Sequence, residues 1–181
     1  LLPFTAENVA TVPICREEIL LIVPDEVIHK AYPDRFEEIK KKLYQSADVR
    51  LLENCPFVLL KKGNRVRTIA DELFEDTQIT PHIVLETENI ETVLALSVQG
   101  MGITFYPRMF MSSKQNLKAY HDSLMKQAGL NLFSLNYPRA HGTLAIGYHK
   151  GHYMSRATHE FIRTALEHIP SAAGLPLNTD V

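Results

Sequence analysis

The pattern of apolar and polar positions is clearest in residues 81–107, PHIVLETENIETVLALSVQGMGITFYP. The short apolar run IVL predicts a buried strand. Apolar positions then recur three and four apart, which predicts a helix that Glu88 or Asn89 caps and Gly100 ends. A second strand, ITFY, follows, so this stretch is predicted to form a parallel, right-handed strand–helix–strand unit.

A similar pattern precedes this stretch. The apolar run at residues 57–60 predicts a central strand that is covered on both faces, and a helix is expected from about residue 66 to residue 74. Joined to residues 81–107, these segments make an unbroken β-α-β-α-β order, which is typical of an α/β lobe.

Weaker patterns flank this lobe. The other expected elements are extended segments at residues 12–14 and 19–23, helices at 33–46 and 116–127, and strands at 132–135 and 142–151. A closing helix is expected at residues 155–169 with Ser155 as its N-cap. Its inward-facing side chains are expected to be Phe161, Ile162, Ala165, Leu166 and Ile169.

Composition narrows the classes of function. The 181 residues carry a formal net charge of -2, and the pI is about 6.5, so a basic DNA-binding face is not expected on this chain. The sequence has no apolar run long enough to cross a bilayer, and its first residues lack the pattern of a signal peptide. We therefore expect a cytoplasmic protein without a membrane partner.

Candidate chemical groups are few. Cys15 and Cys55 are expected to be buried thiols in a reducing compartment, and their role is left open. Five histidines fall near the C-terminus, namely His141, His149, His152, His159 and His168. They lack a nearby cysteine and a shared helix face, so we expect no metal site. Because no nucleophile elbow or phosphate loop occurs either, we expect no catalytic residue and no cofactor.

Three sequence patterns resemble one family. These are LSVQGMGITFYP at residues 96–107, VPICREEILLIVPDEVIH at residues 12–29, and the spacing of Pro56, Gly63, Arg67, Asp71 and Phe74. Together they resemble the effector-binding domain of LysR-type transcriptional regulators. The resemblance implies an α/β, two-lobed type 2 periplasmic-binding-protein-like fold.

The resemblance also implies how the lobes divide the chain. Residues 1–48 and 136–181 are expected to form the first lobe, and residues 49–135 the second. The family pattern places about seventy further residues before residue 12, so the first lobe is expected to be incomplete. The DNA-binding domain of such a regulator would lie further upstream and is not expected in this chain.

The ends of the predicted strands indicate where a ligand would bind. In open α/β sheets, ligands bind beyond the carboxyl ends of strands, where helix starts present free N–H groups. The residues that we expect there are Lys61, Lys62, Gly63, Asn64, Thr87, Glu88, Asn89, Ile90, Thr104 and Tyr106. The lysines favour an anionic ligand, whereas the negative charge of Glu88 is also compatible with a zwitterionic ligand. The same polar residues could equally be helix caps and turn residues.

Three functions remain under consideration. The first is the sensor domain of a LysR-type regulator, whose resemblance implies a small-molecule effector, a homodimer or homotetramer, and DNA contact through an upstream domain. The second is a solute-binding protein of a transport system, which shares the two-lobed fold. The third is an enzyme on this fold, for which the sequence offers no convincing acid–base pair.

Overall fold

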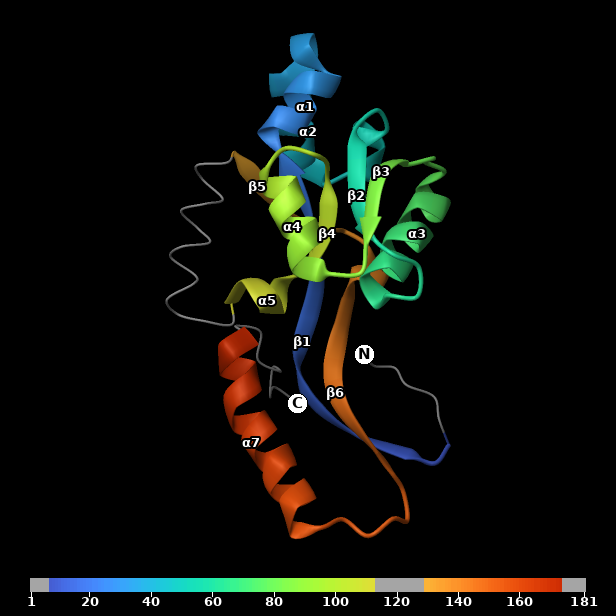
Figure 1. Ribbon diagram of the computed structural model, residues 1–181, viewed down its shortest axis with the longest axis vertical. Helices are drawn as coiled ribbons and strands as arrows, with labels where there is room; N and C mark the ends of the chain where they lie inside the picture. Colours follow the sequence, from blue (N-terminus) through green and yellow to red (C-terminus); the bar gives the residue numbers. More distant parts are fainter. Residues whose placement is uncertain (1–6, 113–128, 174–181) are drawn as a thin grey trace. The chain divides into compact units, whose positions relative to one another are not determined.

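The computed structural model of the chain describes residues 7–112 and 129–173. The described residues belong to two compact units (Figure 1). Unit 1 takes its residues from Leu1–Glu18, Arg108–Lys118 and His141–Val181, and unit 2 takes them from Ile19–Pro107 and Ala119–Ala140. The helix expected at residues 116–127 lies outside the described residues.

The sheet of unit 2 is built around strand β1 (Val9–Pro24), whose second half pairs antiparallel with β4 (Thr104–Pro107) and with β5 (Leu130–Ser134). Residues 19–107 belong to unit 2, whereas the resemblance implied that residues 1–48 lie in the first lobe. The reason is that β1 is one continuous strand, so its partners rather than its periodicity decide where each half belongs.

Two further strands form a separate two-stranded sheet, which an isolated bridge links to the first. Strand β2 (Pro56–Leu60) pairs parallel with β3 (His82–Thr87), as expected. A parallel bridge between Phe57 and Ile103 joins β2 to the start of β4. It is formed by bonds from Val58 N to Ile103 O (2.9 Å) and from Ile103 N to Pro56 O (2.8 Å). Strand β2 therefore lies between β3 and β4.

The prediction that the strand around residues 83–85 is buried was wrong. Strand β3 pairs with β2 alone among the described residues, and its side chains alternate between exposed and half-buried. Val84 is 43% exposed. An edge strand with one covered face shows this alternation, whereas strand β2, which has neighbours on both sides, is almost wholly buried.

Two helices pack on β2 and β4, namely α3 (Arg65–Thr77) and α4 (Ile90–Val98). Phe74 of α3 makes edge-to-face contacts with Phe57 of β2 and Phe105 of β4, at centroid distances of 5.1 and 5.7 Å. Burying each such side chain contributes about 1.5–3 kcal/mol. This aromatic cluster lies within the core of unit 2.

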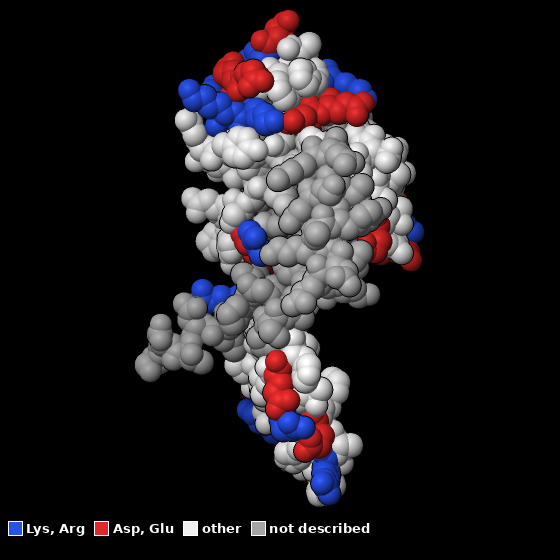
Figure 2. Space-filling model, turned by 90° about the vertical axis from the view of Figure 1, so that its left-hand side faces the viewer, with Lys and Arg blue, Asp and Glu red and all other residues white. Residues whose placement is uncertain are grey.

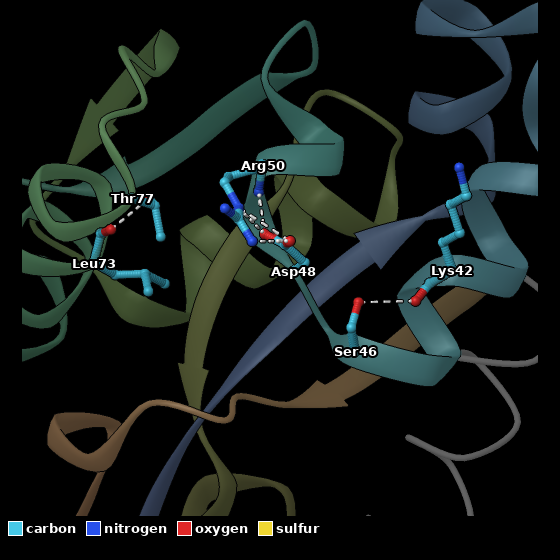
Figure 3. Close-up of polar contacts among 6 residues, drawn as sticks. All are labelled: Lys42, Ser46, Asp48, Arg50, Leu73 and Thr77. Atoms are coloured by element: carbon cyan, nitrogen blue, oxygen red, sulfur yellow. Dashed lines mark hydrogen bonds and ion pairs between the residues drawn. The ribbon is translucent and has the colours of Figure 1, made fainter.

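A helical segment precedes β2. It contains α1 (Asp25–Ala31), the 3₁₀ turn η1 (Pro33–Arg35), α2 (Phe36–Ser46) and the 3₁₀ turn η2 (Val49–Leu52). Ala47 ends α2 in the left-handed conformation, and the Asp48 carboxylate then accepts bonds from the backbone N and the guanidinium of Arg50 (Figure 3). Figure 2 shows acidic and basic side chains interleaved over α1 and α2, a mixed surface rather than a basic face.

Unit 1 contains the first half of β1, which pairs antiparallel with β6 (His141–His149) and shifts register between Pro13 and Cys15. The two extended segments expected at residues 12–14 and 19–23 are thus one strand. The short helix α5 (Arg108–Ser112) packs against α7 (Arg156–Ala173).

The closing helix α7 agrees only in part with expectation. Ser155 caps it, since its hydroxyl accepts a bond from Thr158 N over 3.2 Å. Ala165 is buried, but Phe161 is 65% exposed and Leu166 is 40% exposed, so these two do not pack inward among the described residues. None of the helices in the described ranges has the length and apolarity that a membrane crossing requires.

Candidate functional site

Two chain turns meet at the carboxyl ends of β2 and β3. Lys61–Asn64 connects β2 to α3, and Glu88–Asn89 connects β3, which ends at Thr87, to α4. The backbone N–H of Lys61 donates to Thr87 O over 2.9 Å, which ties the turns together. The structure therefore brings together the eight predicted residues from Lys61 to Asn64 and from Thr87 to Ile90. We call this surface the α3–α4 face.

Both helix starts on this face are capped by asparagine. Asn64 Oδ1 accepts from Val66 N (2.9 Å), and Asn89 Oδ1 accepts from Thr92 N (3.0 Å). Thr87 Oγ1 accepts in turn from Asn89 N over 3.3 Å. Each asparagine satisfies one of the four amide groups that a helix start leaves unbonded. The cap role that the sequence left open is thus present at both asparagines.

The charges of the face are partly neutralised. Lys61 Nζ lies 3.0 Å from Glu88 Oε1, and both side chains are largely exposed, so this ion pair contributes little stability. Lys62 is exposed and forms no ion pair within the described ranges. Gly63 between the lysines and Asn64 has φ +96°, a conformation that favours glycine. The face therefore presents two ammonium groups beside two helix starts, and among the described residues only that of Lys61 forms an ion pair.

Thr104 and Tyr106 are placed differently from the other predicted residues. Their side chains are buried, with exposures of 1% and 0%. The Tyr106 hydroxyl donates to Glu91 Oε1 over 3.0 Å. Burial first, and then the bond to Glu91, raise the pKa of Tyr106 above its ordinary value. Tyr106 thus holds the first turn of α4 from within the core. The exposed surface of the face consists of the two turns.

Arg67 is a supporting residue that sequence reasoning did not single out as part of the site. It is only 4% exposed and lies under the ends of β2 and β3. Its Nη1 donates to Leu60 O over 2.9 Å and to the Glu86 carboxylate, and its Nε donates to Asp71 over 2.6 Å. The hydrogen bond from Arg67, and then its positive charge, lower the pKa of Glu86. The four-residue spacing of Arg67 and Asp71 on a helix was the available sequence signal.

The other candidate groups stay apart from this face. Cys15 and Cys55 are both buried free thiols, as expected, and they belong to different units. The rings of His149 and His152 lie 4.4 Å apart. Across residues 7–112 and 129–173, no cluster of three or more His, Cys, Asp or Glu side chains could hold a metal ion.

Comparison with known proteins is consistent with this architecture. The LysR substrate binding domain matches residues 1–170. The chain is 29% identical over 119 residues to YcgK of Bacillus subtilis, an uncharacterized HTH-type transcriptional regulator, in a match that covers 62% of this chain and 37% of YcgK. A second Bacillus subtilis regulator of this kind, YybE, is also 29% identical, and 34% of it is covered. The chain spans about a third of the length of these relatives.

Solved structures show the same fold. The effector-binding domain of QuiR in complex with shikimate aligns with a TM-score of 0.59 at 19% identity, covering 91% of this chain and 68% of that one. The CcmR regulatory domain of Synechocystis PCC6803 in complex with 2-PG aligns with a TM-score of 0.61 at 14% identity, covering 91% and 69%. With a family match across most of its length, the chain belongs to the LysR substrate-binding domain family.

Proposed function

We propose that this chain is the effector-binding sensor domain of a LysR-type transcriptional regulator, and that a small anionic or zwitterionic metabolite binds at its α3–α4 face. One observation carries the position of the site: two capped helix starts lie side by side at the carboxyl ends of adjacent parallel strands, tied by the Lys61 N to Thr87 O bond. Such helix starts attract anions. Lys62 adds a positive charge without an ion-pair partner in the described residues.

The relatives support a regulator rather than a transport protein. Both Bacillus subtilis relatives are HTH-type transcriptional regulators. The QuiR and CcmR domains, which share the fold, hold the small molecules shikimate and 2-PG. A solute-binding protein is the alternative, because it uses the same two-lobed architecture.

The partners follow from the regulator assignment. We propose that the protein forms a homodimer or homotetramer in the cytoplasm, and that it reaches DNA through an upstream helix-turn-helix domain. Effector binding would shift the equilibrium between two arrangements of the protein. This shift would change how the DNA-binding domains contact DNA. The sequence encoded upstream of this chain distinguishes the two proposed functions. A helix-turn-helix there supports the regulator, and a signal peptide supports the transport protein.

A thermal-shift screen tests the ligand class. The complete effector domain is heated with small carboxylates, aromatic acids, sulfate and amino acids, because a ligand that binds only the folded state raises the midpoint in proportion to RT ln(1 + [L]/Kd). Lys62→Met is the test variant, since Asn64 and Asn89 are caps whose loss would itself lower stability. Lys41→Met, an exposed lysine of α2, is the matched control.

We expect at least one anion or zwitterion to raise the midpoint of the wild type and of Lys41→Met, and to raise that of Lys62→Met less. A ligand whose effect is equal in all three proteins would place the site elsewhere. Turnover of a compound that does not raise the unfolding midpoint would favour the enzyme hypothesis.

A further inference from the structure

Unit 2 contains a hollow beside the last turn of α2 and strand β5. Its volume is about 630 Å³, within the range of small-molecule sites. It is lined by residues 43–47, at the end of α2, by residues 132–134 of β5, and by Asn136. None of these residues belongs to the α3–α4 face. We call this space the β5 hollow.

The β5 hollow lies along one edge of β5. Successive side chains of a strand point to opposite faces of its sheet, and residues 132, 133 and 134 all line the hollow. The hollow therefore borders the edge of the strand rather than one face. Among the described residues β5 pairs with β1 alone, so this edge is the one that faces away from β1.

The backbone of Leu132 points to this open edge. Facing residues of antiparallel strands alternate between pairs that exchange backbone bonds and pairs that do not. Asp25 N donates to Gly129 O over 2.8 Å, and three residues further along the same register Ile22 faces Leu132. Ile22 and Leu132 are therefore a pair without backbone bonds. The N–H and C=O of Leu132 thus offer one donor and one acceptor on the side away from β1.

Tyr44 gives the β5 hollow an aromatic wall that is exposed and yet fixed in place. Tyr44 is 63% exposed, but its hydroxyl donates to Asn131 Oδ1 over 2.6 Å. Its ring meets Phe133 edge to face at a centroid distance of 5.1 Å. Asn131 is only 6% exposed, and its Nδ2 donates to Val23 O over 3.0 Å. A ring that is already held in this way loses little conformational entropy when a ligand packs on it.

The chemistry of the wall favours a neutral ligand. The described residues that line the hollow carry no charged side chain, and the carbonyl end of α2 disfavours a negative charge. A group that bonds to both backbone atoms of Leu132 must hold an acceptor next to a donor. A group that covers the Tyr44 ring must be flat.

We propose that the β5 hollow binds a small, neutral aromatic carboxamide, with its ring against Tyr44 and its amide group on the backbone of Leu132. The amide oxygen accepts from Leu132 N–H, and the amide nitrogen donates to Leu132 O. These are the two bonds that a residue of a neighbouring strand would exchange with Leu132. The proposal goes beyond the proposed function, because the α3–α4 face is assigned to an anion or a zwitterion.

Calorimetric titration of the full-length protein with three probes tests the ligand class. Benzamide has the flat ring and the amide, benzoate has nearly the same shape with a negative charge, and cyclohexanecarboxamide has the amide without a flat ring. Tyr44→Leu is the test variant, since it removes the aromatic wall. Tyr153→Leu is the matched control, because Tyr153 is 92% exposed and belongs to unit 1.

Benzamide is expected to bind saturably to the wild type and to Tyr153→Leu, and about tenfold more weakly to Tyr44→Leu. Benzoate and cyclohexanecarboxamide are expected to bind the wild type more weakly than benzamide does. Three results would each overturn the proposal: no saturation of the wild type by benzamide, equal benzamide affinity in Tyr44→Leu, or benzoate binding as tight as that of benzamide.

A second measurement uses the wild type and remains decisive if Tyr44→Leu does not fold. The protein is isotope-labelled at its leucine amides and titrated with benzamide by NMR. A new hydrogen bond is expected to move the amide proton signal of Leu132 downfield. The amide of Leu20, which lies in β1 between β4 and β5, is expected to move less. A Leu132 signal that stays unchanged at saturating benzamide contradicts the assignment of its backbone to the ligand.

Discussion

The hydroxyl of Tyr106, in β4, donates a hydrogen bond to the Glu91 carboxylate in the first turn of α4, over 3.0 Å. The Tyr106 side chain has 0% exposure, whereas Glu91 lies on the exposed side of α4. The bond joins the central sheet of unit 2 to the helix start that forms half of the α3–α4 face. This tertiary contact supports the α3–α4 face, whose exposed residues belong to two local turns.

Tyr106→Phe removes this support with little change of shape. We expect the free energy of unfolding to fall by about 1 kcal/mol at neutral pH, the net value of a typical hydrogen bond. Urea denaturation of both proteins gives the difference. Circular dichroism before denaturation checks that the variant is folded, and an unchanged midpoint would show that the bond contributes nothing.

The same residue predicts an alkaline effect. Because the pKa of Tyr106 in the folded state is raised above 10.0, its stabilising contribution is complete below pH 10 and is lost as the pH rises through the folded-state pKa. Phenylalanine cannot ionise. The stability difference between wild type and Tyr106→Phe is therefore expected to be smaller at about pH 11 than at about pH 8, and an equal difference at both would contradict the pKa direction.

Arg67→Met tests the ion network beneath the turns. The substitution leaves Leu60 O without its buried donor and two carboxylates without their cation. Since Asp71 and Glu86 are each more than 40% exposed, water can partly replace the guanidinium. We therefore expect a loss of about 2 kcal/mol, most of it from the buried carbonyl, measured by urea denaturation.

Arg163→Met is the control for that experiment. Arg163 also contacts two carboxylates, those of Glu160 and Glu167, but all three side chains are at least half exposed. Its loss is expected to cost less than about 1 kcal/mol. Equal effects of the two substitutions would mean that burial of Arg67 does not matter.

Gly102→Ala tests the close approach of β4 to β2. A Cβ at Gly102 would lie 2.8 Å from the backbone oxygen of Pro56, which cannot move without shifting the strand. We expect a loss of about 1–3 kcal/mol. In the control Gly147→Ala the new Cβ meets Val9 Cγ1 at 3.3 Å, a side-chain atom that can adjust, so thermal melting should show the larger drop for Gly102→Ala.

Cys55 is expected to be unreactive in the folded protein. Burial raises its pKa to about 12, so almost none of it is thiolate at physiological pH, and the thiolate is the reactive form. Burial likewise raises the pKa of Cys15, with Glu17 adding to the effect. Reaction with a disulfide reagent should therefore be slow in buffer and fast in denaturant. Rapid reaction of either cysteine in the folded protein would support a redox role for that thiol.

Local patterns were sufficient for the helix boundaries on the α3–α4 face. Asn89 caps α4, and Gly100 follows its end with φ +71°, as the order of polar, periodic and glycine positions predicted. The turn at Lys61–Asn64 and the Ser155 cap were predictable for the same reason. Each depends on bonds between residues at most four apart in the chain, so the sequence around it carries the whole signal.

The sequence by itself thus determined the α/β class, the β-α-β-α-β order of residues 56–107 and the two turns that form the candidate face. Tertiary structure alone decided that β1 is shared by both units, that β3 is a half-exposed edge, and that Tyr106 turns inward to Glu91. It also decided that Glu17 is buried with an unbonded oxygen. These features depend on partners distant in the chain, and periodicity records which face of an element is apolar but not which neighbour covers it.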